Sequence, residues 1–88
     1  MDYNFCTEEN RIYLKDEHGK IVAEIDFREI EKGVYDIYHT YVDENLRGMK
    51  IASKLVKAAF KEITKRNSKV VASCSYAKKW LEKNNIEI

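Results

Sequence analysis

Apolar and polar positions alternate in the first half of the chain. In residues 11–15 and again in residues 21–27 every second side chain is apolar, and the polar stretch DEHGK separates the two segments. Alternation with period two predicts β-strands, so the two segments are expected to pair as a hairpin. Residues 34–42 follow a turn at Gly33, are rich in β-branched and aromatic side chains, and contain no proline. They are expected to form a central strand.

The pattern then changes to a helical period. Between about Lys50 and Arg66 an apolar residue recurs at every fourth position. These residues are Ile51, Leu55, Ala59 and Ile63. The spacing predicts one long amphipathic helix that directly follows the central strand.

Three shorter elements are expected after this helix. Residues 69–74 are typical of a buried strand, residues 76–84 of a second helix, and residues 85–88 offer a short last strand. The apolar stripe of the second helix consists of Ala77, Trp80 and Leu81. Its lysines at positions 78, 79 and 83 are expected on a solvated face, with contact to ligand phosphates as the alternative.

This order predicts an α+β fold. A central mixed sheet of about four to five strands is expected, with one long helix and a second, C-terminal helix. The strands on either side of the long helix form a β-α-β unit and are therefore expected to be parallel. At 88 residues the chain is expected to fold as a single domain, residues 1–88.

Composition and charge exclude several classes of function. Hydrophobic residues make up 44% of the chain and charged residues 35%, which is typical of a soluble globular protein. The net charge is only +1, so we expect no nucleic-acid partner. Apolar runs are short and there are two cysteines, so we expect no membrane association, no disulfide framework and a cytoplasmic location.

The start of the long helix is a candidate anion site. The first turn of a helix presents unpaired N–H groups and a partial positive charge. Gly48 lets a ligand approach the backbone, and Arg47 and Lys50 add donors for phosphate oxygens. We therefore predict a pyrophosphate cradle here; the alternative is that Gly48 is an ordinary turn residue.

The segment LRGMKIASKLV resembles the acetyl-coenzyme A loop of the GNAT superfamily of N-acetyltransferases, which carries the motif Gln/Arg-x-x-Gly-x-Gly/Ala. Arg47 matches the first position and Ala52 the last, whereas Lys50 stands where glycine is expected. The segments VYDIYHTYVDENLRG and VVASCSYAKKWLEKN are similar to a small, single-domain GNAT-like family with an HT-V strand and a CSYA segment. This resemblance covers nearly the whole chain and implies a minimal GNAT-like fold.

The resemblance implies an N-acetyltransferase that uses acetyl-coenzyme A, with a small amine or a protein amino group as acceptor. The pantetheine arm is then expected beside the backbone of Tyr41, Val42 and Asp43. The pyrophosphate is expected on residues 47–53, which are Arg47, Gly48, Met49, Lys50, Ile51, Ala52 and Ser53. The alternative is a non-catalytic acyl-coenzyme A-binding or protein-interaction module on the same fold.

Two residues are candidates for the base that deprotonates the acceptor amine. His39 is the first, because imidazole exchanges protons near neutral pH. The alternative for His39 is a hydrogen-bonded structural histidine. Glu24 is the second candidate, although a solvated sheet face also accounts for Glu24 and its neighbour Asp26.

Cys74 and Tyr76 are candidates for chemistry at the thioester. Cys74 lies at the end of a strand and just before a helix, where the thiolate is favoured. It suits a nucleophile or a proton donor to the leaving thiolate, or it is a packed or cofactor-contacting residue without chemistry. Many GNAT enzymes place a tyrosine acid in the following helix in the pattern Ala-x-x-Leu-Tyr, which this chain lacks, and Tyr76 is the nearest replacement.

Metal ligands and subunit interfaces are poorly represented in the sequence. The two histidines and two cysteines form no close pair with metal-ligand spacing, so we expect no metal site. A chain this short has no visible acceptor pocket, and we expect a monomer or a weak homodimer.

Overall fold

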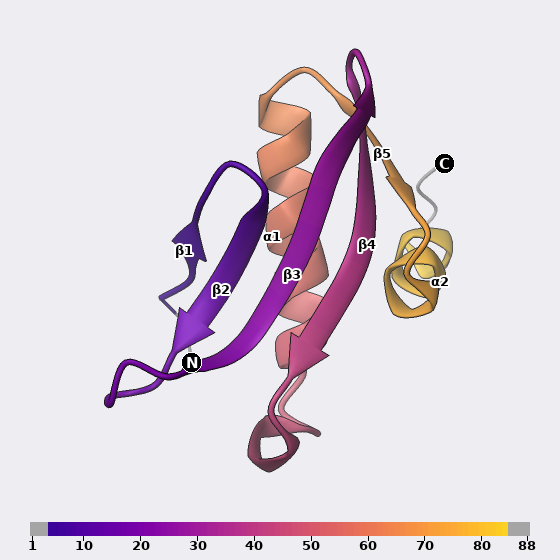
Figure 1. The fold of residues 1–88 in the computed structure, drawn as a ribbon. Helices are drawn as coiled ribbons and strands as arrows, with labels where there is room; N and C mark the ends of the chain where they lie inside the picture. The colour runs from indigo at the N-terminus through magenta and orange to yellow at the C-terminus, as the bar shows by residue number, and fades with distance from the viewer. Residues whose placement is uncertain (1–3, 85–88) are drawn as a thin grey trace.

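The computed structural model describes residues 4–84, which form one five-stranded sheet, two α-helices and a short 3-10 turn (Figure 1). The elements are β1 (Cys6–Thr7), β2 (Arg11–Lys15), β3 (Ile21–Glu31), β4 (Val34–Val42), the 3-10 turn (Glu44–Leu46), α1 (Ile51–Lys65), β5 (Lys69–Ala72) and α2 (Ser75–Lys83). The strands lie in the order β1-β2-β3-β4-β5. Only β4 and β5 are parallel, and the other neighbours are antiparallel. The predicted α+β fold with a mixed sheet and two helices is confirmed.

The expected elements are present with three corrections. Strand β1 was not predicted, because two residues are too few to show a period. The long helix does not follow β4 directly, since residues 43–50, including the 3-10 turn, intervene. Strand β5 ends at Ala72 and not at Cys74, and the last strand proposed for residues 85–88 lies outside the described residues.

The core lies between α1 and the sheet. The helix buries one stripe, which consists of Ile51, Leu55, Val56, Ala59 and Ile63. It faces the alternate apolar residues of three strands, which include Ile12, Ala23, Ile25, Phe27 and Ile37. Burial of one such large aliphatic side chain contributes about 1.5–3 kcal/mol, so this contact is the main source of stability.

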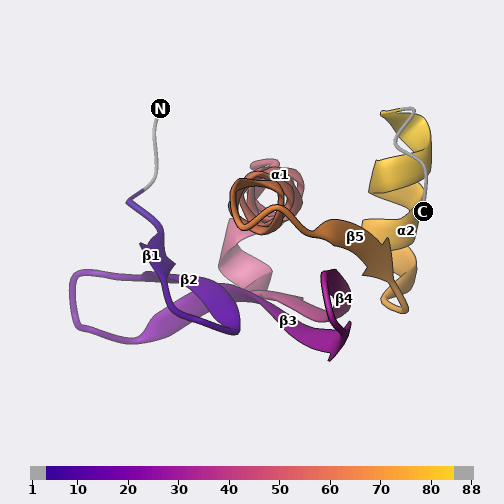
Figure 2. The ribbon, with the colours of Figure 1, turned by 90° about the horizontal axis from the view of Figure 1, so that it is seen from above.

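Helix α2 stands at the β5 edge, on the same side of the sheet as α1 (Figure 2). Trp80 joins the two helices: its Nε1 donates to Ser53 Oγ at 2.9 Å, and its ring lies 6.5 Å from that of Phe60. Trp80 therefore packs the second helix, as its place in the apolar stripe predicts. Among residues 4–84, no helix is both long enough and apolar enough to cross a membrane.

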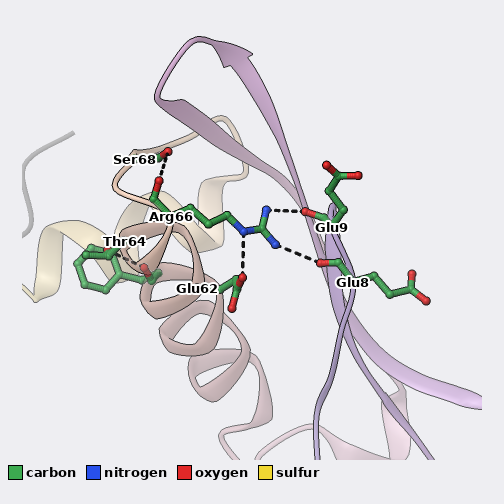
Figure 3. A network of polar contacts seen from close by, with 7 residues as sticks. Glu8, Glu9, Glu62, Thr64, Arg66 and Ser68 are labelled. Atoms are coloured by element: carbon green, nitrogen blue, oxygen red, sulfur yellow. Dashed lines mark hydrogen bonds and ion pairs between the residues drawn. The ribbon is translucent and has the colours of Figure 1, made fainter.

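Arg66 ties the end of α1 to the turn between β1 and β2 (Figure 3). Its Nε donates to Glu62 Oε2 at 2.9 Å, and its Nη1 donates to the carbonyl oxygen of Glu9 at 2.7 Å. The guanidinium carbon also lies 5.5 Å from the ring centres of Phe27 and Tyr35. The Arg66 side chain thus bonds to a residue 57 positions earlier in the sequence and covers the end of the core.

The other face of the sheet carries polar and aromatic side chains. Cross-strand partners point to the same face, and Arg11 pairs with Asp26, which pairs with His39. In the next row Tyr13 pairs with Glu24, which pairs with Tyr41. No described helix covers these two rows, which we call the open face (Figure 2).

Candidate functional site

Strands β4 and β5 separate halfway along β4. Their pairing runs only from Val34–Lys69 to Ile37–Ala72. The N–H groups of Ser73 and Cys74 then both donate to the carbonyl oxygen of Ile37 at 3.1 Å, which ends the ladder. Beyond this point β4 continues to Val42 while the chain turns into α2, so residues 38–42 have no strand partner on that side (Figure 1). We call this interruption of the sheet between β4 and α2 the opening.

The edge of β4 that faces this opening offers backbone donors and acceptors. Successive strand residues direct their N–H and C=O groups alternately to the two sides. The N–H of Asp43 donates to Val22 O on β3 at 2.7 Å, so Asp43 and Tyr41 face β3. By the same alternation Val42 and Thr40 face the opening. Of Tyr41, Val42 and Asp43, which were expected beside an extended ligand with amide groups, only Val42 directs its N–H and C=O toward the opening. Thr40 does so too, but it was not predicted from the sequence.

A hollow of about 280 Å³ lies at the start of α1. Its lining residues are Val42, Leu46, Arg47, Gly48, Lys50, Ile51, Ala52 and Tyr76. The first N–H with an acceptor inside the helix is that of Lys54, which donates to Lys50 O at 3.2 Å. The N–H groups of residues 51–53 therefore have no acceptor inside the helix, and the Lys50 side chain makes no cap hydrogen bond to them. Five of the seven predicted cradle residues line this hollow, and its N–H groups are donors of the kind that anions bind.

Backbone geometry accounts for Lys50 at the position where the GNAT motif has glycine. Lys50 adopts the left-handed conformation, with φ 60° and ψ 23°. Glycine reaches this region freely, whereas other residues pay about 1–2 kcal/mol. Gly48 also has a positive φ of 87°, and a Cβ added there meets no atom within 4 Å. The loop thus keeps the glycine-like turn with a lysine in place of the glycine.

A second hollow of about 670 Å³ continues from the first between α1 and α2. It shares Lys50 and Tyr76 with the first hollow and is lined by Lys50, Ser53, Lys57, Tyr76, Lys79, Trp80, Lys83 and Asn84. Four of these are lysines and none is acidic, so we call it the lysine groove. From the sequence, Lys79 and Lys83 were expected mainly on a solvated face, and Lys57 was missed. Helical spacing could have revealed Lys57, because positions 50, 53 and 57 share one helix face.

Cys74 lies at the end of the opening where β4 and β5 separate. It precedes the first residue of α2, and its Sγ lies 3.5 Å from Thr40 Oγ1. The preceding residue is held firmly: the buried carboxylate of Asp36 accepts hydrogen bonds from the N–H of Ser73 at 2.7 Å and from its hydroxyl at 2.8 Å. The thiol is thus fixed beside the unpaired edge of β4.

His39 lies on the other face from the contact between Thr40 and Cys74. Its cross-strand partner is Asp26, whereas Thr40 pairs with Ile25 on the helix-covered face. The structure therefore places the two expected catalytic side chains on opposite sides of β4.

The carboxyl group of Asp26, beside His39, has an unusual proton affinity. Partial burial, together with a hydrogen bond with Glu24 and the charge of Glu24, raises the pKa of Asp26 to about 6. The positive charges of His39 and Arg11 act in the opposite direction. Asp26 was predicted only as part of a solvated face, and the sequence gives no sign of its burial.

Four other expected site residues lie outside the first hollow. Asp43 caps the 3-10 turn through Asn45 N–H, and Ser53 accepts the Trp80 hydrogen bond. Tyr41 and Met49 are exposed, at 40% and 49%. Tyr76 stands between the first hollow and the lysine groove. Within residues 4–84 no three His, Cys, Asp or Glu side chains gather in a way that suits a metal ion.

Comparison with known proteins identifies the class to which this fold and site belong. Residues 11–87 match the family described as GCN5-related N-acetyl-transferase, so the chain belongs to that family. Protein NATD1 of Danio rerio is 33% identical over 73 residues, which cover 83% of this chain and 64% of the zebrafish protein. The chain thus spans slightly less than two thirds of this relative.

Solved structures show the same fold. A GCN5-like protein of Staphylococcus aureus, determined by NMR, is 35% identical with a TM-score of 0.77, and the match covers 94% of this chain and 81% of that one. The GNAT family N-acetyltransferase YhbS of Escherichia coli, crystallised in complex with CoA, has a TM-score of 0.64. It is 19% identical, over 70% of this chain and 38% of its own, and so supports the fold alone.

Proposed function

We propose that this protein is an N-acetyltransferase that takes its acetyl group from acetyl-coenzyme A and passes it to an amine. The observation that carries the proposal is a row of three neighbouring sites that match successive parts of coenzyme A. The open edge of β4, the N–H groups at the start of α1 and the lysine groove follow one another. Coenzyme A is a chain of two amides, a diphosphate and a further ribose phosphate, and the series offers partners in that order.

Each part of the site has its own task in this proposal. The N–H and C=O groups of Val42 and the C=O group of Thr40 pair with the amides of the pantetheine arm. Arg47, Lys50 and the N–H groups of residues 51–53 hold the diphosphate. The lysine groove receives the remaining phosphate, since its four ammonium groups are within one hollow. This assignment places the thioester at the upper end of the opening, beside Cys74.

The acceptor amine approaches from the open face. The helices cover the other face (Figure 2), and the pairing of β4 with β5 ends before His39, so in this proposal the amine reaches the thioester from the side of His39. His39 takes the proton of the amine, whose nitrogen then bonds to the thioester carbon as the carbon–sulfur bond breaks. The backbone N–H of Thr40, two residues before Val42 and at the Cys74 end of this edge, stabilises the oxyanion, and the other backbone groups of the edge pair with the pantetheine arm. Cys74 suits protonation of the leaving thiolate or transient acceptance of the acetyl group.

A titration with acetyl-coenzyme A tests the proposal. At about 100 times the dissociation constant the ligand should stabilise the fold by about 2.7 kcal/mol, a rise in Tm of roughly ten degrees for so small a domain. Arg47→Ala/Lys50→Ala should weaken the shift. The control Lys61→Ala/Lys69→Ala removes the same charge from exposed positions outside both hollows and should not.

A screen of amines with the wild-type protein then separates the two classes of function. Release of coenzyme A that depends on an amine supports the enzyme. Binding without turnover of any amine would favour a non-catalytic acyl-coenzyme A-binding module. No shift at millimolar acetyl-coenzyme A would overturn both.

A further inference from the structure

A β-bulge in β4 decides which face His39 occupies. Before the bulge Phe27 pairs with Ile37, and after it Asp26 pairs with His39, so Tyr38 is an extra residue in β4. In an unbroken ladder Asp26 would face Tyr38, and His39 would face Ile25 on the helix-covered side. The extra residue therefore moves His39 to the open face, which is a known use of bulges near active sites.

The bulge places His39 next to Asp26. Side chains directly opposite in an antiparallel pair have Cβ atoms roughly 4.5–5.5 Å apart. The imidazole and the carboxylate are not hydrogen-bonded in the described structure, but a rotation of the two side chains is enough to bring them together. Tyr38 itself is fixed by Arg28, whose guanidinium carbon lies 4.7 Å from the centre of the ring. Tyr38 and Asp26 also line one hollow of about 400 Å³ on this face.

Several charged groups surround Asp26. They are Arg11 on β2, Glu24 and Arg28 on β3, and His39 on β4. Burial and the neighbouring Glu24 carboxyl raise the pKa of Asp26 to about 6. A positive charge on His39 lowers the pKa of Asp26, so the two groups interact electrostatically.

We propose that Asp26 is the positioning residue of the base His39: its carboxylate orients the imidazole on the open face and stabilises the imidazolium that forms there. This inference rests on the proposed function. The proton leaves the nitrogen of the acceptor amine and forms a new N–H bond on the ring of His39. Asp26 stays ionised during this transfer and touches neither the amine nor the thioester.

The first test needs no activity. The carboxyl carbon of Asp26 is followed by NMR as a function of pH in the wild type and in His39→Gln, with Glu31→Gln as a control on the same strand. Loss of the imidazolium should raise the pKa of Asp26 by a few tenths of a unit or more, and the control should leave it in place. An identical Asp26 titration in wild type and His39→Gln overturns the inference.

The second test is the pH dependence of acetyl transfer. Asp26→Asn should lower kcat about tenfold and move the rise of kcat with pH to lower pH, because the imidazolium has lost its carboxylate partner. The KM for acetyl-coenzyme A should not change, since both hollows that hold it are untouched. Asp26→Glu should restore part of the rate.

If kcat of Asp26→Asn depends on pH in the same way as kcat of Glu31→Gln, the inference is also overturned. A wild-type protein that acetylates no amine overturns the proposed function, and with it the catalytic role of Asp26. The two failures are distinguishable, because the carboxyl titration reports the electrostatic interaction between Asp26 and His39 in either case.

Discussion

The hydroxyl of Thr40 lies 3.5 Å from the thiol of Cys74, at the point where β4 and β5 no longer share backbone hydrogen bonds. This contact joins the edge of β4 to the start of α2. It places a nucleophilic atom where the proposed function puts the thioester.

Replacement of Cys74 should reveal its role. If the thiol carries the acetyl group, intact mass of the wild type mixed with acetyl-coenzyme A shows one added acetyl group, and Cys74→Ala removes it. If the thiol is a proton donor, no adduct forms, and Cys74→Ala lowers kcat about a hundredfold or more. A variant with unchanged kcat and no adduct in the wild type would leave Cys74 as a packing residue.

Lys50 carries strain that can be separated from its charge. Lys50→Gly should raise the free energy of unfolding by about 0.5–1 kcal/mol, because relief of the left-handed conformation exceeds the entropy cost of glycine. Lys50→Ala loses the same ammonium group and keeps the strain. Both variants should bind acetyl-coenzyme A more weakly than the wild type. In urea unfolding, only Lys50→Gly should be more stable than the wild type.

The lysine groove should recognise one phosphate of coenzyme A. Lys79→Ala/Lys83→Ala should weaken the binding of coenzyme A about tenfold, which corresponds to about 1.4 kcal/mol. The same variant should bind 3′-dephospho-coenzyme A as the wild type does. Calorimetric titration with both ligands measures the difference, and an equal loss for both would place the ribose phosphate elsewhere.

Arg66 should be a main support of the fold. Arg66→Ala removes three hydrogen bonds and the cover over two aromatic rings, and it should cost about 2 kcal/mol. Lys65→Ala, one residue earlier and exposed, should change the stability by less than about 0.5 kcal/mol. Equal effects of the two substitutions in denaturant unfolding would contradict this account.

The raised pKa of Asp26 also predicts how stability depends on pH. The folded protein holds this proton up to about pH 6, whereas an unfolded chain releases it near pH 4. Between these values the folded state binds more protons, so the contribution of Asp26 to stability falls as pH rises. The side chain is only partly buried, so solvent screening limits the change to the order of 1 kcal/mol. Asp26→Asn should gain stability over the wild type at pH 7 but not at pH 4.

The elements and the loop could be predicted from local pattern, and the register that places His39 opposite Asp26 could not. Alternation in β3 and the four-residue recurrence in α1 place their apolar faces correctly, because burial of one face imposes these periods. Alternation fails in β4 after Ile37, where Tyr38 shifts the register with no glycine to mark it. Nor does the sequence show that Lys50 adopts a conformation that lysine rarely takes.

Both helices lie on one side of the sheet, and this has a consequence for the choice of acceptor. A deep pocket selects a substrate by enclosing it, whereas an uncovered face selects a substrate by how far its reactive group projects. No described helix lies over the open face, so none limits the size of the molecule to which the amino group belongs. If the proposed function holds, an amino group that protrudes from the surface of a folded macromolecule reaches the opening as readily as one on a free metabolite.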